Sequence, residues 1–137
     1  MKNSSIKKKI INAPISIGEL VDKITILEIK KNKLQNSKLE NVLKELSFLR
    51  KLMEKHQLEI TDDLFTQLKE INLTLWNIED QIRIKEKNKE FDNIFIELAR
   101  SVYFKNDKRA EIKKRINQLS NSETVSYTHL TLPTTQV

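Results

Sequence analysis

Apolar residues recur at alternating steps of four and three along the middle of the chain. The run consists of Leu64, Leu68, Ile71, Leu75, Ile78 and Ile82. Steps of this size place all its members on one stripe of an α-helix, whereas a half-buried strand needs a period of two. A helix with one apolar stripe buries that stripe against other helices. The sequence therefore predicts a helical bundle of the all-α class.

Capping residues predict where each helix begins. A Ser followed three residues later by a Glu forms a capping box, in which each side chain accepts a hydrogen bond from a backbone N–H at the helix start, and Thr, Asp or Asn caps a helix alone. The expected starts are the boxes Ser16/Glu19 and Ser37/Glu40, then Thr61, Asp92 and finally Asn106-Asp107, which would interrupt the fourth helix and begin a fifth. We expect about five helices in a small up-and-down bundle, and no strand.

The 137 residues are few enough for one domain. We expect a basic, flexible arm over residues 1–13 and a helical-bundle domain over residues 14–121. Residues 125–134 resemble the in-frame translation of a transposon-end adapter used in sequencing libraries. We therefore interpret residues 122–137 as a foreign tail that replaces the native C-terminus, the alternative being a β-prone terminal strand. Tyr127 and His129 are accordingly left out of every candidate site.

The net charge of +6 is concentrated near the two ends of the predicted fold. The first eleven residues hold four lysines and no acid, and Lys105 to Arg115 holds six basic and two acidic residues. Residues 12–104 carry fifteen basic and sixteen acidic side chains, so the body is nearly neutral. Nucleic-acid binders present a coherent basic face with stacking aromatics, and aromatics are 6% of this chain. We do not expect nucleic acid as a partner.

Several chemistries lack the residues that they need. Phosphate-binding glycine loops need several glycines, and Gly18 is the single glycine of the chain. Thiolate catalysis and cysteine zinc sites need cysteine, which is absent. Outside the tail, His56 is the sole imidazole, and we expect it at the surface. We therefore expect no metal and no cofactor. No apolar run reaches the roughly 20 residues that span a bilayer, so we expect a cytoplasmic protein.

Polar residues beside the apolar stripes are the candidate site. The third helix carries such residues at steps of three and four, and Glu79 precedes Arg83 in the favourable order for an ion pair. The candidate anion-binding residues are Lys23, Arg83, Arg100 and Arg109. The wider polar seam consists of Asp22, Glu28, Trp76, Glu79, Glu97, Tyr103, Asn106 and Asp107.

Two interpretations of this polar seam are open. In the first, the seam forms interhelical ion pairs that fix register, and the protein is a binding or interaction module that contacts a protein partner or a second copy. In the second, the basic residues converge on a small carboxylate or phosphate ligand, which a carboxylate orients in a small enzyme or sensor. The first is favoured, so we lean against an enzyme.

Two motifs carry a resemblance to a known family. They are PISIGELVDKITIL at Pro14 to Leu27 and ARSVYFKND at Ala99 to Asp107. With the residues between them, they resemble DUF6165, a domain-of-unknown-function family of small proteins from bacteria and their viruses. The resemblance covers about Pro14 to Asn117 and implies no established activity. It does imply an accessory role close to surface-polysaccharide or glycosyltransferase pathways.

Overall fold

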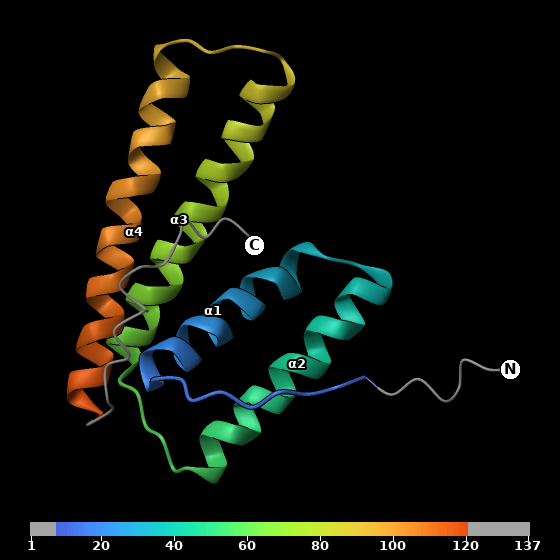
Figure 1. The fold of residues 1–137 in the computed structure, drawn as a ribbon, viewed down its shortest axis with the longest axis vertical. Coiled ribbons are helices and arrows are strands. Elements are labelled where there is room, and N and C mark those ends of the chain that lie inside the picture. Colours follow the sequence, from blue (N-terminus) through green and yellow to red (C-terminus); the bar gives the residue numbers. More distant parts are fainter. Residues whose placement is uncertain (1–7, 121–137) are drawn as a thin grey trace, which may run out of the picture.

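The computed structural model describes residues 8–120 and is helical throughout its regular structure. Four helices follow one another as α1 (Ile17–Lys33), α2 (Asn36–Lys55), α3 (Asp62–Lys87) and α4 (Asn93–Leu119). Figure 1 shows two antiparallel hairpins, α1–α2 and α3–α4, with the first packed obliquely across the lower half of the second. The all-α prediction is confirmed for the described part of the chain.

Helix α1 is the central element, because it packs against each of the other three helices. Ser16 caps it as expected: the side-chain Oγ accepts a hydrogen bond from the Glu19 N–H at 3.1 Å. Residues buried on α1 lie on both of its sides, so it contributes to two apolar clusters. Leu20, Ile24 and Leu27 pack against α2, and Val21 packs against α3 and α4. Little of its circumference is left for solvent.

Helix α2 begins two residues earlier than the capping box predicted, since a Ser37 N-cap would place the first helical residue at Lys38. It starts at Asn36, whose φ is 60°, and its N-cap is Gln35, which makes no side-chain capping hydrogen bond. The prediction of a Ser37/Glu40 box was therefore wrong. Packing accounts for the helix without a cap, since Val42, Leu46 and Leu49 are buried against α1.

Helix α3 begins as predicted, with the Thr61 Oγ1 accepting a hydrogen bond from the Leu64 N–H. Its apolar stripe is buried from Leu64 to Ile78, and Ile82 is half-buried. The neighbours of this stripe change along the helix. Leu64, Leu68 and Ile71 share a cluster with α1 and α4, whereas the last turns of α3 lie beyond α1 and have α4 as their neighbour (Figure 1).

Helix α4 is continuous where a break was predicted, so the structure has four helices in place of about five. These four helices are counted over residues 8–120. The Asp92 cap of α4 is confirmed, because the Asp92 Oδ1 accepts from the Phe95 N–H at 3.0 Å. At the expected break, the Asn106 Oδ1 accepts a hydrogen bond from Arg109 within the helix. A capping residue begins a new helix only where the backbone leaves helical geometry. Here the burial of Arg109, Ile112 and Lys113 keeps the backbone helical.

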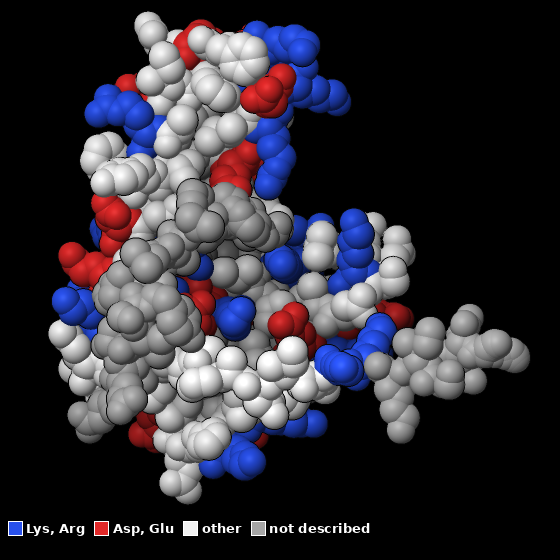
Figure 2. Space-filling view, viewed as in Figure 1, with Lys and Arg blue, Asp and Glu red and all other residues white. Residues whose placement is uncertain are grey.

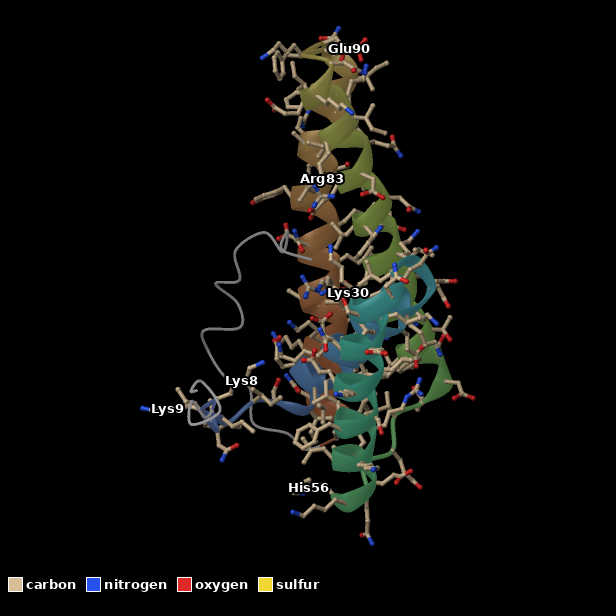
Figure 3. The ribbon with its side chains drawn as sticks, turned by 90° about the vertical axis from the view of Figure 1, so that its right-hand side faces the viewer. Lys8, Lys9, Lys30, His56, Arg83 and Glu90 are labelled. Carbon is tan, nitrogen blue, oxygen red and sulfur yellow. The ribbon has the colours of Figure 1, made fainter. Side chains whose placement is uncertain are left out.

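The two halves of the α3–α4 hairpin differ in burial. The buried residues of α4 all lie between Arg109 and Asn117, and those of α3 lie between Leu64 and Glu79. Residues 80–108, which include the turn that joins the helices, contain no buried residue. We call this segment the distal half. It projects past α1 and α2 at the top of Figure 1, and Figure 3 labels Glu90 at its tip.

Charged side chains of both signs occur over the visible surface. Figure 2 shows Lys and Arg interspersed with Asp and Glu on this face. None of the described helices is long and apolar enough to cross a membrane. The basic arm predicted over residues 1–13 is described from residue 8, and residues 8–13 are exposed and outside any helix. The predicted tail over residues 122–137 lies outside the described residues.

Candidate functional site

The first turn of α1 lies unusually close to α4. The Gly18 N–H donates a hydrogen bond of 2.7 Å to the Asn117 Oδ1. A β-carbon on Gly18 would stand 2.5 Å from the backbone carbonyl oxygen of Lys113, closer than real β-carbons approach other atoms. This position therefore requires glycine because of the neighbouring helix, although the backbone of Gly18 is ordinary helix.

One turn further along α1, Asp22 and Arg109 form a buried ion pair. The Arg109 Nε donates to the Asp22 Oδ1 at 2.9 Å, and the Nη2 donates to the Oδ2. The side chains are 1% and 8% exposed. Lys113, also buried, lies between two carboxylates, with its Nζ at 2.7 Å from Glu19 and 3.7 Å from Asp22. Two acids and two bases thus balance one another.

Neutral side chains complete the hydrogen bonding of Asp22. The Asn72 Nδ2 donates to the Asp22 Oδ1 at 2.9 Å and to the Thr25 Oγ1 at 2.8 Å. Thr25 in turn donates to the backbone carbonyl of Asp22. Among the described residues, no buried side-chain nitrogen or oxygen lacks a hydrogen-bond partner. We call this set the polar cluster; it consists of Glu19, Asp22, Thr25, Asn72, Arg109 and Lys113.

The polar cluster keeps its central pair charged. Burial acts to raise the pKa of Asp22, but the hydrogen bond and charge of Arg109, with Lys113 and Asn72, outweigh burial and hold the pKa below its ordinary value. Burial acts to lower the pKa of Arg109, and Asp22 outweighs it, so that pKa is raised. A proton is therefore not readily exchanged within the pair. The geometry favours a structural tie between α1 and α4 over acid–base chemistry.

Glu79 is the acid of this region whose burial is least offset by nearby positive charges. Desolvation by burial raises its pKa, and the charges of Arg83 and Arg109 only partly oppose the effect. Its ion pair with Arg83 is long, at 3.6 Å, and Arg83 also contacts Asp80 at 3.1 Å. Figure 3 places Arg83 on the α3–α4 hairpin beyond Lys30 of α1. Glu79 thus borders the polar cluster on the side of the distal half.

A small cavity lies beside Glu79, with a volume of about 20 Å³. Its lining combines apolar and polar side chains from α1, α3 and α4: Ile26, Ile29, Asn72, Leu75, Trp76, Glu79 and Arg109. A cavity of this size holds a water molecule. Lys33 lies over Trp76, one of the lining residues, with its Nζ 5.9 Å from the centre of the indole ring. A carboxylate or phosphate metabolite would enter only if these helices moved apart.

A second ion-pair group joins three helices on the other side of α1. The Glu28 carboxylate accepts hydrogen bonds from Lys69 of α3, at 2.9 Å, and from Arg50 of α2. Burial acts to raise the pKa of Glu28, and these two cations outweigh it, so the pKa is lowered. Both cations are more than a third exposed, so solvent screens these two ion pairs and weakens their contribution.

The structure brings together only part of the predicted site. Asp22 and Arg109 are direct partners, and Asn106 accepts from Arg109 at 3.3 Å. The cavity beside them adds Trp76 and Glu79. Arg83 is exposed on α3 and reaches the edge of the site through its ion pair with Glu79. The remaining predicted residues lie elsewhere: Lys23 exposed on α1, Glu28 in its own group, Arg100 and Glu97 as an exposed pair, and Tyr103 and Asp107 exposed on α4. Convergence of the four cations on an anion stays a prediction.

Six members of the structural site were missed. They are Gly18, Glu19, Thr25, Asn72, Lys113 and Asn117, and all except the half-buried Glu19 are buried. Their spacing was a usable signal, because Gly18, Asp22 and Thr25 follow one face of α1. Arg109, Lys113 and Asn117 likewise recur at steps of four on α4. Among residues 8–120, no three His, Asp or Glu side chains gather as a group that could hold a metal ion.

These observations define a small all-α protein of two packed hairpins with a buried, charge-balanced tie between its first and last helices. Residues 11–135 match the family of unknown function DUF6165, and the chain belongs to this family. The resemblance carried by the two motifs is thereby confirmed. The match extends into residues 122–137, whose foreign origin stays a prediction. No curated protein and no solved structure matches the chain.

Proposed function

We propose that this protein is a helical interaction module whose contact surface is on the distal half of the α3–α4 hairpin. Six large apolar side chains there are between 50% and 67% exposed. They are Ile84, Phe91, Ile94, Ile96, Tyr103 and Phe104, and we call them the distal apolar surface. These side chains come from α3, the turn and α4, and large exposed apolar side chains gathered at one end of a small protein are typical of a site for another protein.

The first turns of α4 carry this proposal. From Ile94 to Phe104, apolar residues lie around most of the helix circumference at 100° per residue. Helix α3 covers one side, where Phe95, Leu98 and Val102 are half-buried. The opposite side keeps Ile96 and Tyr103 exposed. A helix that is apolar around most of its circumference is ordinarily enclosed on more than one side, so this segment favours a further helical surface as its partner.

The polar cluster supports the same function from inside the fold. It ties α1 to the proximal part of α4, opposite the end where the distal apolar surface lies. A hairpin whose base is fixed in this way presents its free end with little loss of conformational entropy on binding. We assign the polar cluster the role of supporting the distal apolar surface and no role in binding a substrate.

The resemblance to the family adds a pathway to the proposal. We assign the module an accessory role in surface-polysaccharide or glycosyltransferase pathways. The alternative of an anion-binding enzyme or sensor has support in the proximity of Glu79, Arg83 and Arg109. The cavity of about 20 Å³ beside them makes it the second choice.

Site-specific photo-crosslinking tests the module. The photoreactive amino acid benzoylphenylalanine replaces Tyr103 on the distal surface, or Phe48 of α2 as the matched control, which is 66% exposed and outside the surface. Irradiation in cells and of the purified protein is followed by mass analysis of the adducts. We expect adducts above the monomer mass from position 103 and not from position 48. Equal adduct formation at both positions, or none at 103, would contradict the proposal.

A further inference from the structure

We infer that the distal apolar surface binds a second copy of this chain, through an antiparallel, two-fold symmetric contact between the α4 helices. The inference rests on the proposed function and names its partner. It also rests on one face of α4 that carries both apolar and charged residues. When the same face of a second copy lies against it in the antiparallel direction, residues of opposite charge meet.

This face runs from Ile96 to Phe104, which is about two turns of α4. Ile96, Arg100 and Tyr103 follow one another at steps of four and three, and Glu97, Arg100 and Phe104 form the adjacent row. The side chains of this face are all at least half exposed. The rows point away from α3, because the residues toward α3, Leu98, Val102 and Lys105, are half-buried. No other described helix covers the face (Figure 1).

The charges near the middle of the face have opposite signs. Glu97 and Arg100 are 73% and 65% exposed, and within one chain their nearest atoms are 3.8 Å apart, which is a weak contact. Across a two-fold axis, if Glu97 faces Arg100 of the second copy, then Arg100 faces Glu97 of that copy. One antiparallel register therefore forms two reciprocal ion pairs close to the axis. A parallel alignment sets like charges opposite each other.

The same register brings apolar residues together on both sides of the axis. If Glu97 lies opposite Arg100 in an antiparallel pair, Ile96 lies within one turn of Tyr103 of the second copy. Phe104 then lies near the beginning of the other α4, beside Asn93 and Ile96. The Tyr103 and Phe104 rings are already edge to face, with centroids 5.7 Å apart, and form a firm apolar edge. Ion pairs at the centre set the register, and apolar contacts at the flanks provide affinity.

The area available agrees with a weak to moderate dimer. From their exposed fractions and the 150–250 Å² of an aromatic side chain, the six residues of the distal apolar surface expose about 700 Å². A standard interface buries about 800 Å² per partner. The symmetric contact encloses part of this surface, which favours an equilibrium between monomer and dimer. The pairing also completes a four-helix arrangement of two hairpins, the usual way in which paired helices bury a second side.

Reciprocal charge exchange tests the register. Sedimentation velocity of the full chain, from 1 to 200 µM, measures the dimer dissociation constant for wild type, Glu97→Arg, Arg100→Glu and the double variant. We expect each single change to weaken dimerisation by about tenfold or more, because it opposes like charges twice across the axis. The double variant restores both pairs and should return to within about threefold of wild type. Both positions are exposed, so the monomer fold is retained, and circular dichroism checks this.

Two matched Phe→Ser substitutions test the apolar contacts on either side of the two-fold axis. Phe104→Ser should weaken the dimer, whereas Phe48→Ser, which removes an equally exposed phenylalanine from α2, should leave the dissociation constant unchanged. A wild type that is monomeric at 200 µM overturns the inference, as does a dimer indifferent to both single charge changes. If the protein is monomeric but position 103 still crosslinks to another protein, the interaction module stands and self-association falls. If position 103 yields no adduct, both fall.

Discussion

Gly18 and Asn117, ninety-nine residues apart in sequence, are joined by a hydrogen bond of 2.7 Å from the glycine N–H to the asparagine side chain. This contact sets how closely α1 approaches α4, since the carbonyl of Lys113 occupies the space in which a β-carbon of residue 18 would lie. The backbone of α1 at Gly18 is thus packed against the backbone of α4 at Lys113, with the Asn117 side chain beside this contact.

Replacing Gly18 with alanine is expected to destabilise the protein, although alanine is the better helix former. The added methyl group must push α1 away from α4, and overpacking of this kind costs about 1–3 kcal/mol. Urea unfolding followed by circular dichroism measures the loss. Asn77→Ala, at an exposed position of α3, is the control and should change the free energy of unfolding by less than about 0.5 kcal/mol. A Gly18→Ala protein as stable as wild type would show that the helices separate at no cost.

Breaking the Asp22–Arg109 pair is expected to cost more than replacing it. Asp22→Asn leaves a buried guanidinium without its counter-charge, and such changes cost about 3–5 kcal/mol. The double variant Asp22→Leu/Arg109→Met removes both charges and should be more stable than either single change. The double-mutant cycle from chemical unfolding gives the coupling energy. Single losses that simply add would mean that the two residues stabilise the fold independently.

The buried carboxylates make stability depend on pH in the acid range. The folded pKa values of Asp22 and Glu28 lie below the ordinary 3.8 and 4.5, which the unfolded chain has. The unfolded state therefore binds more protons at acid pH, so this stabilisation is complete above about pH 5 and is lost as the pH falls through the folded pKa values. Thermal unfolding between pH 7 and pH 3 measures the loss. Asp22→Asn should flatten the profile, and an unchanged slope would exclude Asp22 as its source.

Glu79 should behave in the opposite way. Burial raises its pKa above the ordinary 4.5, so its ionisation favours the unfolded chain as the pH rises above about 4.5. Glu79→Gln removes this penalty and gives up only a 3.6 Å ion pair with exposed Arg83. We expect the variant to melt above wild type at pH 7 and close to it at pH 4. A lower melting temperature at both values would mean that the Arg83 contact outweighs burial.

The anion-binding interpretation has its own thermal test. If the predicted cations hold a carboxylate or phosphate, a panel of anionic metabolites should raise the melting temperature of wild type. Arg83→Ala and Arg100→Ala should abolish that rise, since both residues are exposed and their loss leaves the fold intact. Absence of any shift with wild type would remove this function, and unfolding of both variants would assign the arginines to structure.

Sequence patterns predicted the helices better than the contacts between them. Caps at Ser16, Thr61 and Asp92 are local signals, because a side chain and the N–H that it satisfies lie within one turn. The polar cluster depends on contacts between residues 47 to 94 positions apart, and which acid meets which base is settled by how the hairpins cross. Arg100 and Arg109 are equally basic in sequence, yet one is exposed and the other buried.

The predicted break at Asn106-Asp107 failed for a related reason. Asn and Asp favour helix starts because their side chains compete for backbone N–H groups. In α4 the Asn106 side chain accepts from Arg109 instead, and the helix around it continues into the buried residues of the polar cluster. Tertiary packing thus overrides a local capping signal at the position where the proximal half of the hairpin gives way to the distal half.

Proline substitution distinguishes a continuous α4 from two shorter helices. Asp107→Pro removes an interior helical hydrogen bond and clashes with the preceding turn, so in a continuous helix it should cost about 3 kcal/mol. Asn93→Pro is the matched control, since Asn93 is the first residue of α4 and Asp92 before it is extended, with φ of −91° and ψ of −172°. Proline suits that position, so the control should unfold within about 0.5 kcal/mol of wild type. If Asp107→Pro is tolerated equally well, the hairpin bends between its halves, and the distal surface is hinged on the polar cluster instead of being held rigidly by it.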